Sequence, residues 1–252
     1  MNVERHVLVT EADAALAAAT AFANVSDRAI ASTGRCRVAL SGGRTPAILY
    51  DALADQFADR SIWGAMQVFW GDERMVPPTH EDSNYRMAHA HLLSRVPVEP
   101  TAVHPVPIHP GSVDASATAY ERTIRSMLMA AEPPVFDLVL LGLGADGHTA
   151  SLFPHDRALE ERQRLVVGVR HADTSVDRVT VTLPLLHAAS CVLFFVTGAA
   201  KASAVKAVLA GPDLDRRLPA QMVCRSARQV LWFMDHAAAR ELSTESPRPG
   251  QD

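Results

Sequence analysis

Short, mostly apolar runs of residues recur along the chain and alternate with longer segments that have helical spacing. Runs of this length without polar alternation are typical of strands buried on both faces, as in a parallel sheet. Residues 179–183 differ, because Thr180 and Thr182 share one face, and they are predicted to form an edge or half-exposed strand. The other strands are predicted at residues 7–9, 37–40, 66–70, 138–141, 165–169, 191–196 and 229–234.

Helices are predicted between these strands, the first over residues 11–30, which are rich in alanine. After the strand at residues 37–40, Thr45 is a predicted N-cap and Pro46 a predicted first helical residue, for a helix that reaches Phe57. Further helices are predicted over residues 85–93, from Ser112 or Asp114 to about Ala130, and over residues 201–209.

Strands that alternate with helices over the whole length predict an α/β fold. We expect a doubly wound, mostly parallel, Rossmann-like sheet with helices on both faces and right-handed crossovers. Residues 1–242 are predicted to form a single domain, with room for a small subdomain. Residues 243–252 contain proline and glycine and are predicted to form a flexible tail.

The composition restricts the classes of partner. The formal net charge of −4 argues against a protein that binds nucleic acid or a membrane surface, so positive charge for an anion has to be local. Cys36, Cys191 and Cys224 are far apart in the sequence and lack the spacing of metal ligands, which is typical of a reducing cytoplasm. No run approaches the roughly 18 apolar residues of a spanning helix. We expect a cytoplasmic protein, and a monomer rather than an obligate oligomer.

The turn after the strand at residues 138–141 carries the strongest candidate for a reactive centre. Three glycines between residues 142 and 147 allow the backbone to turn tightly and to approach a ligand. Asp146 and His148 lie at the tip of this turn. In open α/β sheets, ligands bind at the carboxyl ends of the strands, which is where these two side chains fall.

The spacing Gly142-x-Gly144-x-x-Gly147 also matches the dinucleotide-binding fingerprint. That fingerprint requires a helix that opens at the third glycine, but Pro154 would end such a helix after about two turns. The next predicted strand is followed by Arg170 instead of the acidic residue that would bind a ribose. We therefore expect no nicotinamide cofactor.

Three further strand ends carry polar clusters, at residues 41–45, at Asp72 to Arg74 and at Lys201. A glycine-rich turn into a helix suits an anion because its N–H groups are free, and the two cations Arg74 and Lys201 suit a phosphate monoester. A histidine with an acid two residues away can act as a general base. Since the carboxyl ends of parallel strands meet at one edge, we predict one site for a phosphorylated metabolite, with acid–base chemistry and with no metal and no cofactor.

Four motifs, taken together and in this order, resemble those of the 6-phosphogluconolactonase family. The resemblance covers roughly residues 5 to 240 and implies hydrolysis of a sugar-phosphate lactone, 6-phospho-D-glucono-1,5-lactone, to 6-phosphogluconate in the oxidative pentose phosphate route. The motifs are Ser41-Gly42-Gly43-Arg44-Thr45-Pro46, Gly71-Asp72-Glu73-Arg74 with Val76-Pro77 and Ser83-Asn84, Leu141 to Pro154, and Thr197-Gly198-Ala199-Ala200-Lys201.

Glucosamine-6-phosphate deaminase belongs to the same superfamily and shares the Ser-Gly-Gly turn, the Asp-Glu pair and the Asp-Gly-His turn. Its pattern continues into a segment with Asn-Glu-Pro, whose glutamate supports the ring-opening histidine. The corresponding segment here is Ser151-Leu152-Phe153-Pro154, with no carboxylate before Asp156. This difference favours the lactonase, and a deaminase or sugar-phosphate isomerase is the alternative. A non-catalytic sugar-phosphate sensor on the same scaffold is a further alternative.

The resemblance implies that His148 activates the attacking water and that Asp146 orients this histidine, although Asp146 is alternatively a turn-former that bonds the backbone. Asp72 and Asn84 either contact sugar hydroxyls or fix Arg74, and the sequence does not decide between these roles. Arg178, just before a strand, is left outside the predicted site. The phosphate would be held by Arg74, Lys201 and the backbone N–H groups of Gly42, Gly43 and Thr45.

Overall fold

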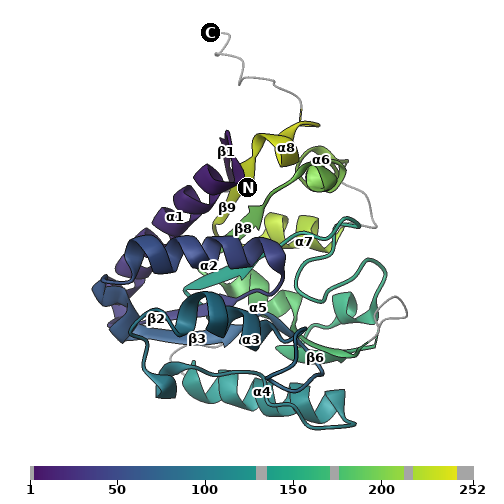
Figure 1. The fold of residues 1–252 in the computed structure, drawn as a ribbon. Helices are drawn as coiled ribbons and strands as arrows, with labels where there is room; N and C mark the ends of the chain where they lie inside the picture. The colour runs from purple at the N-terminus through teal and green to yellow at the C-terminus, as the bar shows by residue number, and fades with distance from the viewer. Residues whose placement is uncertain (1–2, 129–134, 171–175, 213–217, 243–252) are drawn as a thin grey trace.

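The computed structural model describes residues 3–128, 135–170, 176–212 and 218–242. Its centre is a six-stranded sheet in which every pair of neighbouring strands is parallel (Figure 1). The predicted α/β class and the mostly parallel sheet are thus confirmed. In spatial order the strands are β1 (Val3–Leu8), β9 (Val230–Asp235), β8 (Val192–Val196), β5 (Leu138–Leu141), β2 (Cys36–Leu40) and β3 (Met66–Trp70).

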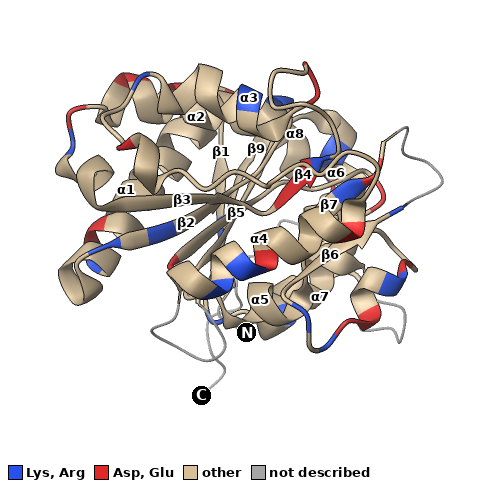
Figure 2. Cartoon of the chain, turned by 90° about the horizontal axis from the view of Figure 1, so that it is seen from below, with Lys and Arg blue, Asp and Glu red and all other residues tan. Residues whose placement is uncertain are grey.

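Helices cover both faces of this sheet, with α1 and α2 on one face and α4, α5 and α7 on the other (Figure 2). α7 and α5 have no counterpart among the predicted helices. The α-helices are α1 (Glu11–Thr33), α2 (Arg44–Phe57), α3 (Asn84–Ala88), α4 (Val113–Met127), α5 (Leu183–Ala188), α6 (Ala202–Ala210), α7 (Pro219–Ser226) and α8 (His236–Ala239). The short turns of other helix types are η1 (Ser61–Ala65), η2 (His89–Leu93), η3 (Pro100–Ala102), η4 (Arg157–Glu160) and η5 (Ala199–Lys201).

A second sheet of three antiparallel strands lies beside the large one, in the order β4 (Asp72–Arg74), β7 (Arg178–Val181) and β6 (Val166–Val169). The prediction of an edge or half-exposed strand at residues 179–183 is wrong, because β7 is the middle strand and Thr180 and Thr182 are completely buried. The Thr180 hydroxyl accepts a hydrogen bond from the Ser151 N–H (3.2 Å), and the Thr182 hydroxyl donates to the Arg164 carbonyl (2.6 Å). The polar face of this strand is therefore satisfied by backbone groups and not by water.

The start of α2 also differs from the prediction. The helix begins at Arg44, and its N-cap is Gly43, with φ of 105° and no side-chain cap. That φ lies in a region that L-residues with a Cβ rarely adopt, so glycine makes the turn two residues earlier than a Thr45 cap would. As a result the Thr45 hydroxyl does not cap the helix.

Two buried tyrosines hold the ends of β2 and β3 from helices on opposite faces of the sheet. The Tyr50 hydroxyl accepts from the Ser41 N–H (2.9 Å) and donates to the Ser41 carbonyl (2.7 Å). The Tyr120 hydroxyl does the same with Trp70, at 2.7 and 3.0 Å. Burial raises the pKa of both phenols, so they act as neutral hydrogen-bonding groups. These clamps fix the points at which the chain leaves the sheet toward the polar strand ends.

We expect Tyr120→Phe to lower the free energy of unfolding by about 1–3 kcal/mol, because it leaves a buried N–H and a buried carbonyl of Trp70 unpaired. Urea unfolding measures the change. Tyr85→Phe is the matched control, since the Tyr85 hydroxyl has no hydrogen-bond partner in the described part of the chain. Equal stabilities of Tyr120→Phe and the wild type would contradict the proposed clamp.

The hydrophobic core includes residues from α1 to α8 and extends over both faces of the large sheet. Within the described ranges, no helix is long and apolar enough to cross a membrane. The single domain over residues 1–242 stays a prediction, and the predicted tail at residues 243–252 lies outside the described residues.

Candidate active site

The candidate site is a cavity of about 490 Å³ at the carboxyl edge of the large sheet. From β2 the chain continues to β3 on one side, whereas β5 lies on the other side of β2 and is followed outward by β8 and β9. The boundary between β2 and β5 is therefore the topological switch point, where open α/β sheets bind their ligands. The turns that follow these two strands, residues 41–46 and 142–150, form most of the cavity lining.

The structure brings together the four polar clusters that the sequence placed on separate strand ends. Of the eight predicted site residues, Asp146 alone is not part of the lining; it contacts the cavity through His148. The other seven line the cavity: Gly42, Gly43, Thr45, Asp72, Arg74, His148 and Lys201.

The turn after β5 places His148 through hydrogen bonds within the turn itself. The Gly144 N–H donates to the His148 carbonyl (2.8 Å), and the Thr149 hydroxyl donates to the Gly142 carbonyl (2.9 Å). A Cβ on Gly144 would lie 2.1 Å from His148 Nδ1 and 2.5 Å from Asp146 Oδ1. The close approach of the imidazole to the backbone therefore requires glycine at position 144.

Asp146 makes the contacts that each of the two roles left open by the sequence would require. Its Oδ1 accepts from the His148 backbone N–H (3.1 Å), as in an Asx turn, and lies 2.7 Å from His148 Nδ1. Burial alone would raise the pKa of Asp146, but this backbone hydrogen bond and the nearby imidazole outweigh it and lower the pKa below its usual value. A carboxylate at Nδ1 selects the tautomer with Nδ1–H, which leaves the lone pair on Nε2.

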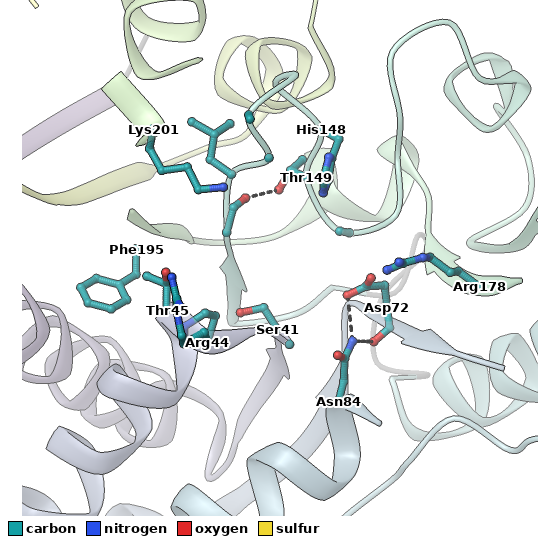
Figure 3. Close-up of a pocket in the computed structure, with 18 of the residues that line it drawn as sticks. Ser41, Arg44, Thr45, Asp72, Asn84, His148, Thr149, Arg178, Phe195 and Lys201 are labelled. Atoms are coloured by element: carbon teal, nitrogen blue, oxygen red, sulfur yellow. Dashed lines mark hydrogen bonds between the residues drawn. The ribbon is translucent and has the colours of Figure 1, made fainter. Parts of the chain in front are cut away.

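Lys201 reaches the cavity from the turn after β8 (Figure 3). Side chains on two other elements hold this turn. The Gly198 N–H donates to both carboxylate oxygens of Asp235, at 3.0 and 3.1 Å, and the Thr197 hydroxyl donates to Glu11. Lys201 is the N-cap residue of α6. An ammonium group at a helix N-terminus opposes the helix dipole, an unfavourable contact that a bound anion reverses.

Asp72 is buried in the cavity wall and held by two neighbours (Figure 3). The Ser151 hydroxyl donates to Asp72 Oδ2 (2.6 Å), and the Asn84 amide donates to the Asp72 carbonyl (2.8 Å) and to Oδ1 (3.3 Å). Neither Asp72 nor Asn84 forms a hydrogen bond with Arg74 in the described structure; the Arg74 guanidinium donates to the Asp82 carbonyl (2.5 Å). Ser151 was not among the predicted site residues, since its partner lies 79 residues away in the sequence.

Glu73 has a structural role beside the cavity. Its carboxylate accepts from the backbone N–H groups of Arg74, Asn84 and Tyr85 and from the Ser83 hydroxyl. Burial raises the pKa of Glu73, and the hydrogen bonds from the three N–H groups act in the opposite direction. The carboxylate thereby fixes the start of α3 and, with it, Asn84.

Arg178 also lines the cavity, although it was not among the predicted site residues. It is the first residue of β7 and lies directly opposite Arg74 in the β4–β7 ladder. Its position before an alternating strand was the available signal, but β4 and β7 are separated by about a hundred residues of sequence.

No metal site is evident in the described residues, where no three His, Cys, Asp or Glu side chains are grouped to hold a metal ion.

A family model described as "Glucosamine-6-phosphate isomerases/6-phosphogluconolactonase" matches residues 9–232. The chain belongs to this family. The resemblance of the four sequence motifs is thus confirmed.

Relatives within the family agree with the match. A 6-phosphogluconolactonase of Nostoc sp. is 43% identical over 220 residues, which are 86% of this chain and 89% of that protein. The solved structure of a 6-phosphogluconolactonase from Trypanosoma cruzi superposes with a TM-score of 0.84 at 30% identity, over 95% of this chain and 97% of that one. A monomeric glucosamine-6-phosphate deaminase has a TM-score of 0.77 at 18% identity, over 96% and 100% of the two chains, and shows the shared fold alone.

Proposed function

We propose that this member of the family hydrolyses 6-phospho-D-glucono-1,5-lactone to 6-phospho-D-gluconate, in the oxidative branch of the pentose phosphate pathway. The observation that carries the proposal is the contact of 2.7 Å between His148 Nδ1 and Asp146, in a cavity that also contains Lys201 and the N-terminus of α2. These are a general base and an anion site in one cavity. The names of the relatives support the same substrate.

In this proposal the phosphate lies between Lys201 and the turn at the start of α2. Lys201 and Arg74 supply positive charge, and the N–H groups of Gly42, Gly43 and Thr45 supply hydrogen bonds. Arg44 also lines the cavity and is exposed.

His148 Nε2 takes a proton from water as the water oxygen attacks the lactone carbonyl carbon. The tetrahedral intermediate then collapses, the bond between C1 and the ring oxygen breaks, and the imidazolium returns the proton to that oxygen. Asp146 stabilises the imidazolium between the two transfers, because its lowered pKa keeps the carboxylate charged. The new carboxylic acid loses its own proton to solvent.

The main alternative is a glucosamine-6-phosphate deaminase or isomerase. The sequence has no carboxylate between Thr149 and His155 that would support a ring-opening histidine. Instead, Ser151 bonds Asp72, and the Phe153 ring packs on the imidazole with centroids 4.8 Å apart. A non-catalytic sugar-phosphate sensor would bind phosphate in the same cavity without turnover.

The test presents the wild-type protein with both substrates. Lactone opening is followed by NMR with the spontaneous rate subtracted, and ammonia release is measured with glucosamine 6-phosphate. We expect lactone hydrolysis well above background and no ammonia. Ammonia release without lactone hydrolysis would establish the deaminase, and binding of sugar phosphates without either reaction would establish the sensor.

Lys201→Met should raise KM by about 10- to 100-fold and change kcat much less, because the phosphate is bound equally in the ground and transition states. Steady-state lactone hydrolysis measures both constants. The chain contains two lysines, and Lys206→Met is the matched control because Lys206 lies exposed on α6. A fall in kcat with an unchanged KM would contradict a phosphate-binding role for Lys201.

We also propose that the protein acts as a cytoplasmic monomer. The three cysteines are free and buried, which suits a reducing compartment. Among the described residues, the large apolar side chains that are exposed are Val7, Val9 and Leu16. So small a set does not form the extensive apolar patch that is typical of an obligate interface.

A further inference from the structure

Arg178 is a cation in the cavity wall, and it has no role in the mechanism proposed above. Figure 3 shows its side chain pointing into the cavity from the side of Asp72, opposite Arg44 and Thr45. Lys201 enters from a different wall in the same view. The cavity therefore holds a positive charge on a different wall from Lys201 and the start of α2.

The guanidinium of Arg178 has no hydrogen-bond or ion-pair partner in the described part of the chain. Its Nε is fully buried and has no hydrogen bond, and no ion pair or hydrogen bond of Arg178 is found in the described ranges. Asp72 is close enough to act on its charge, but the two carboxylate oxygens of Asp72 already accept from Ser151 and Asn84. Arg178 is half-buried, and a buried N–H donor that stays unused is unfavourable unless a ligand supplies the acceptor.

Two cations face each other at this point, since Arg74 and Arg178 are direct partners across the β4–β7 ladder. Burial lowers the pKa of Arg178, and the charge of Arg74 lowers it further, against the opposing effects of Asp72, Asp82 and Glu73. Like charges directly opposite each other in a ladder are destabilising. An anionic ligand at Arg178 would relieve both the repulsion and the unused donors.

Arg178 also lies beside the reactive histidine. The Phe153 ring contacts both side chains, with its centroid 4.8 Å from that of the His148 ring and 6.0 Å from the guanidinium carbon of Arg178. The two groups thus share a neighbouring ring, and both line the same cavity. In the proposed reaction, negative charge develops on the lactone carbonyl oxygen near His148, in the cavity that Arg178 also lines.

We infer that Arg178 binds the carbonyl oxygen at C1 of the lactone and afterwards the carboxylate of the product. This inference rests on the proposed function. As water adds to C1, the carbonyl oxygen becomes an oxyanion, and the planar guanidinium donates to it; when the ring bond breaks, that oxygen becomes part of the carboxylate. The phosphate end and the acyl end of the substrate are then held by different cations, which fixes which end faces His148.

The test compares two ligands that differ only at C1. 6-Phosphogluconate carries a carboxylate there, whereas D-glucitol 6-phosphate carries a neutral CH2OH group. By calorimetry, Arg178→Met should weaken binding of 6-phosphogluconate by about 10- to 100-fold and leave binding of D-glucitol 6-phosphate within about twofold. Lys201→Met should weaken both ligands alike. Arg178→Lys, which keeps the charge but loses the planar fork, should give an intermediate loss for 6-phosphogluconate alone.

Equal weakening of both ligands by Arg178→Met would overturn the inference, and so would no weakening of either. The exposed Arg170, which pairs with Asp114 and Asp177, provides the control variant Arg170→Met, expected to bind both ligands as the wild type does. In lactone hydrolysis, Arg178→Met should lower kcat by about 10²-fold. The binding comparison needs no turnover. If Arg178→Met weakened binding of 6-phosphogluconate alone, while the wild type left the lactone unhydrolysed, the proposed function would be refuted and the carboxylate site retained.

Discussion

His148→Ala is expected to lower kcat for lactone hydrolysis by about 10²- to 10⁴-fold, the usual contribution of a general base. The variant loses the imidazole that takes the proton from water, whereas Lys201 and the turn at the start of α2 remain. Binding of 6-phosphogluconate should therefore weaken by no more than a few-fold. The measurement is the initial rate at saturating lactone, with the spontaneous rate subtracted, together with a binding titration of the product.

The control for this variant is His109→Ala, at an exposed histidine outside the cavity lining. We expect wild-type rates from it. If His148→Ala kept its rate while it bound product normally, the cavity would be the binding site but His148 would not be the base. If the variant lost product binding and rate together, the imidazole would be a binding group and the proton transfer would belong to another residue.

Gly144→Ala should lower kcat by about 10²- to 10³-fold although no reacting group is removed. The new Cβ would stand 2.1 Å from His148 Nδ1 and 2.5 Å from Asp146 Oδ1, distances at which the imidazole, the carboxylate or both have to move. Misplacement of a catalytic group by about 1 Å is enough to cost about 10²-fold in rate. Hydrolysis rates and a thermal unfolding curve, recorded on the same sample, measure the effect.

Gly64→Ala is the control for this substitution, because a Cβ at Gly64 meets no atom within 4 Å and the residue is exposed in η1. It should keep wild-type activity. Gly144→Ala should still unfold cooperatively and still bind 6-phosphogluconate, since the phosphate site lies on other turns. Full activity in Gly144→Ala would mean that the contact between Asp146 and His148 is dispensable for catalysis.

The strands of the large sheet and the convergence of the polar clusters at one edge could be predicted from local sequence. A continuous apolar run such as Leu138–Leu141 has few alternatives to a doubly buried strand, and its carboxyl end determines where Asp146 and His148 are presented. The polar clusters converge because the strands are parallel. The alternation of apolar runs and helical segments, which recurs along the whole chain, predicts this parallel arrangement. Local pattern and overall topology agree here, which is why the prediction succeeds.

The second sheet could not be predicted, because its polar face is satisfied by distant groups. Thr180 and Thr182 alternate as residues facing water would, yet their partners are the Ser151 N–H and the Arg164 carbonyl. No local property of residues 179–183 distinguishes such partners from solvent. The same limitation hid Arg178, which enters the site only because β7 pairs with β4.

The roles of Asp72 and Asn84 depended in the same way on long-range contacts. The sequence allowed both residues either to hold Arg74 or to touch the sugar. In the structure they bond each other, and Ser151 completes the cluster. We propose that this cluster forms the wall against which the sugar hydroxyls lie, since Asp72 and Asn84 line the cavity and Arg74 is bonded elsewhere.

A crystal structure of the complex with 6-phosphogluconate tests the central claim of this account most directly, because it shows which end of the ligand meets which cation. We predict the phosphate within hydrogen-bond distance of Lys201 Nζ and of the N–H groups at the start of α2. The carboxylate should lie between His148 Nε2 and the Arg178 guanidinium. A ligand bound in the reverse direction, with its phosphate at His148, or bound outside this cavity, would contradict the account.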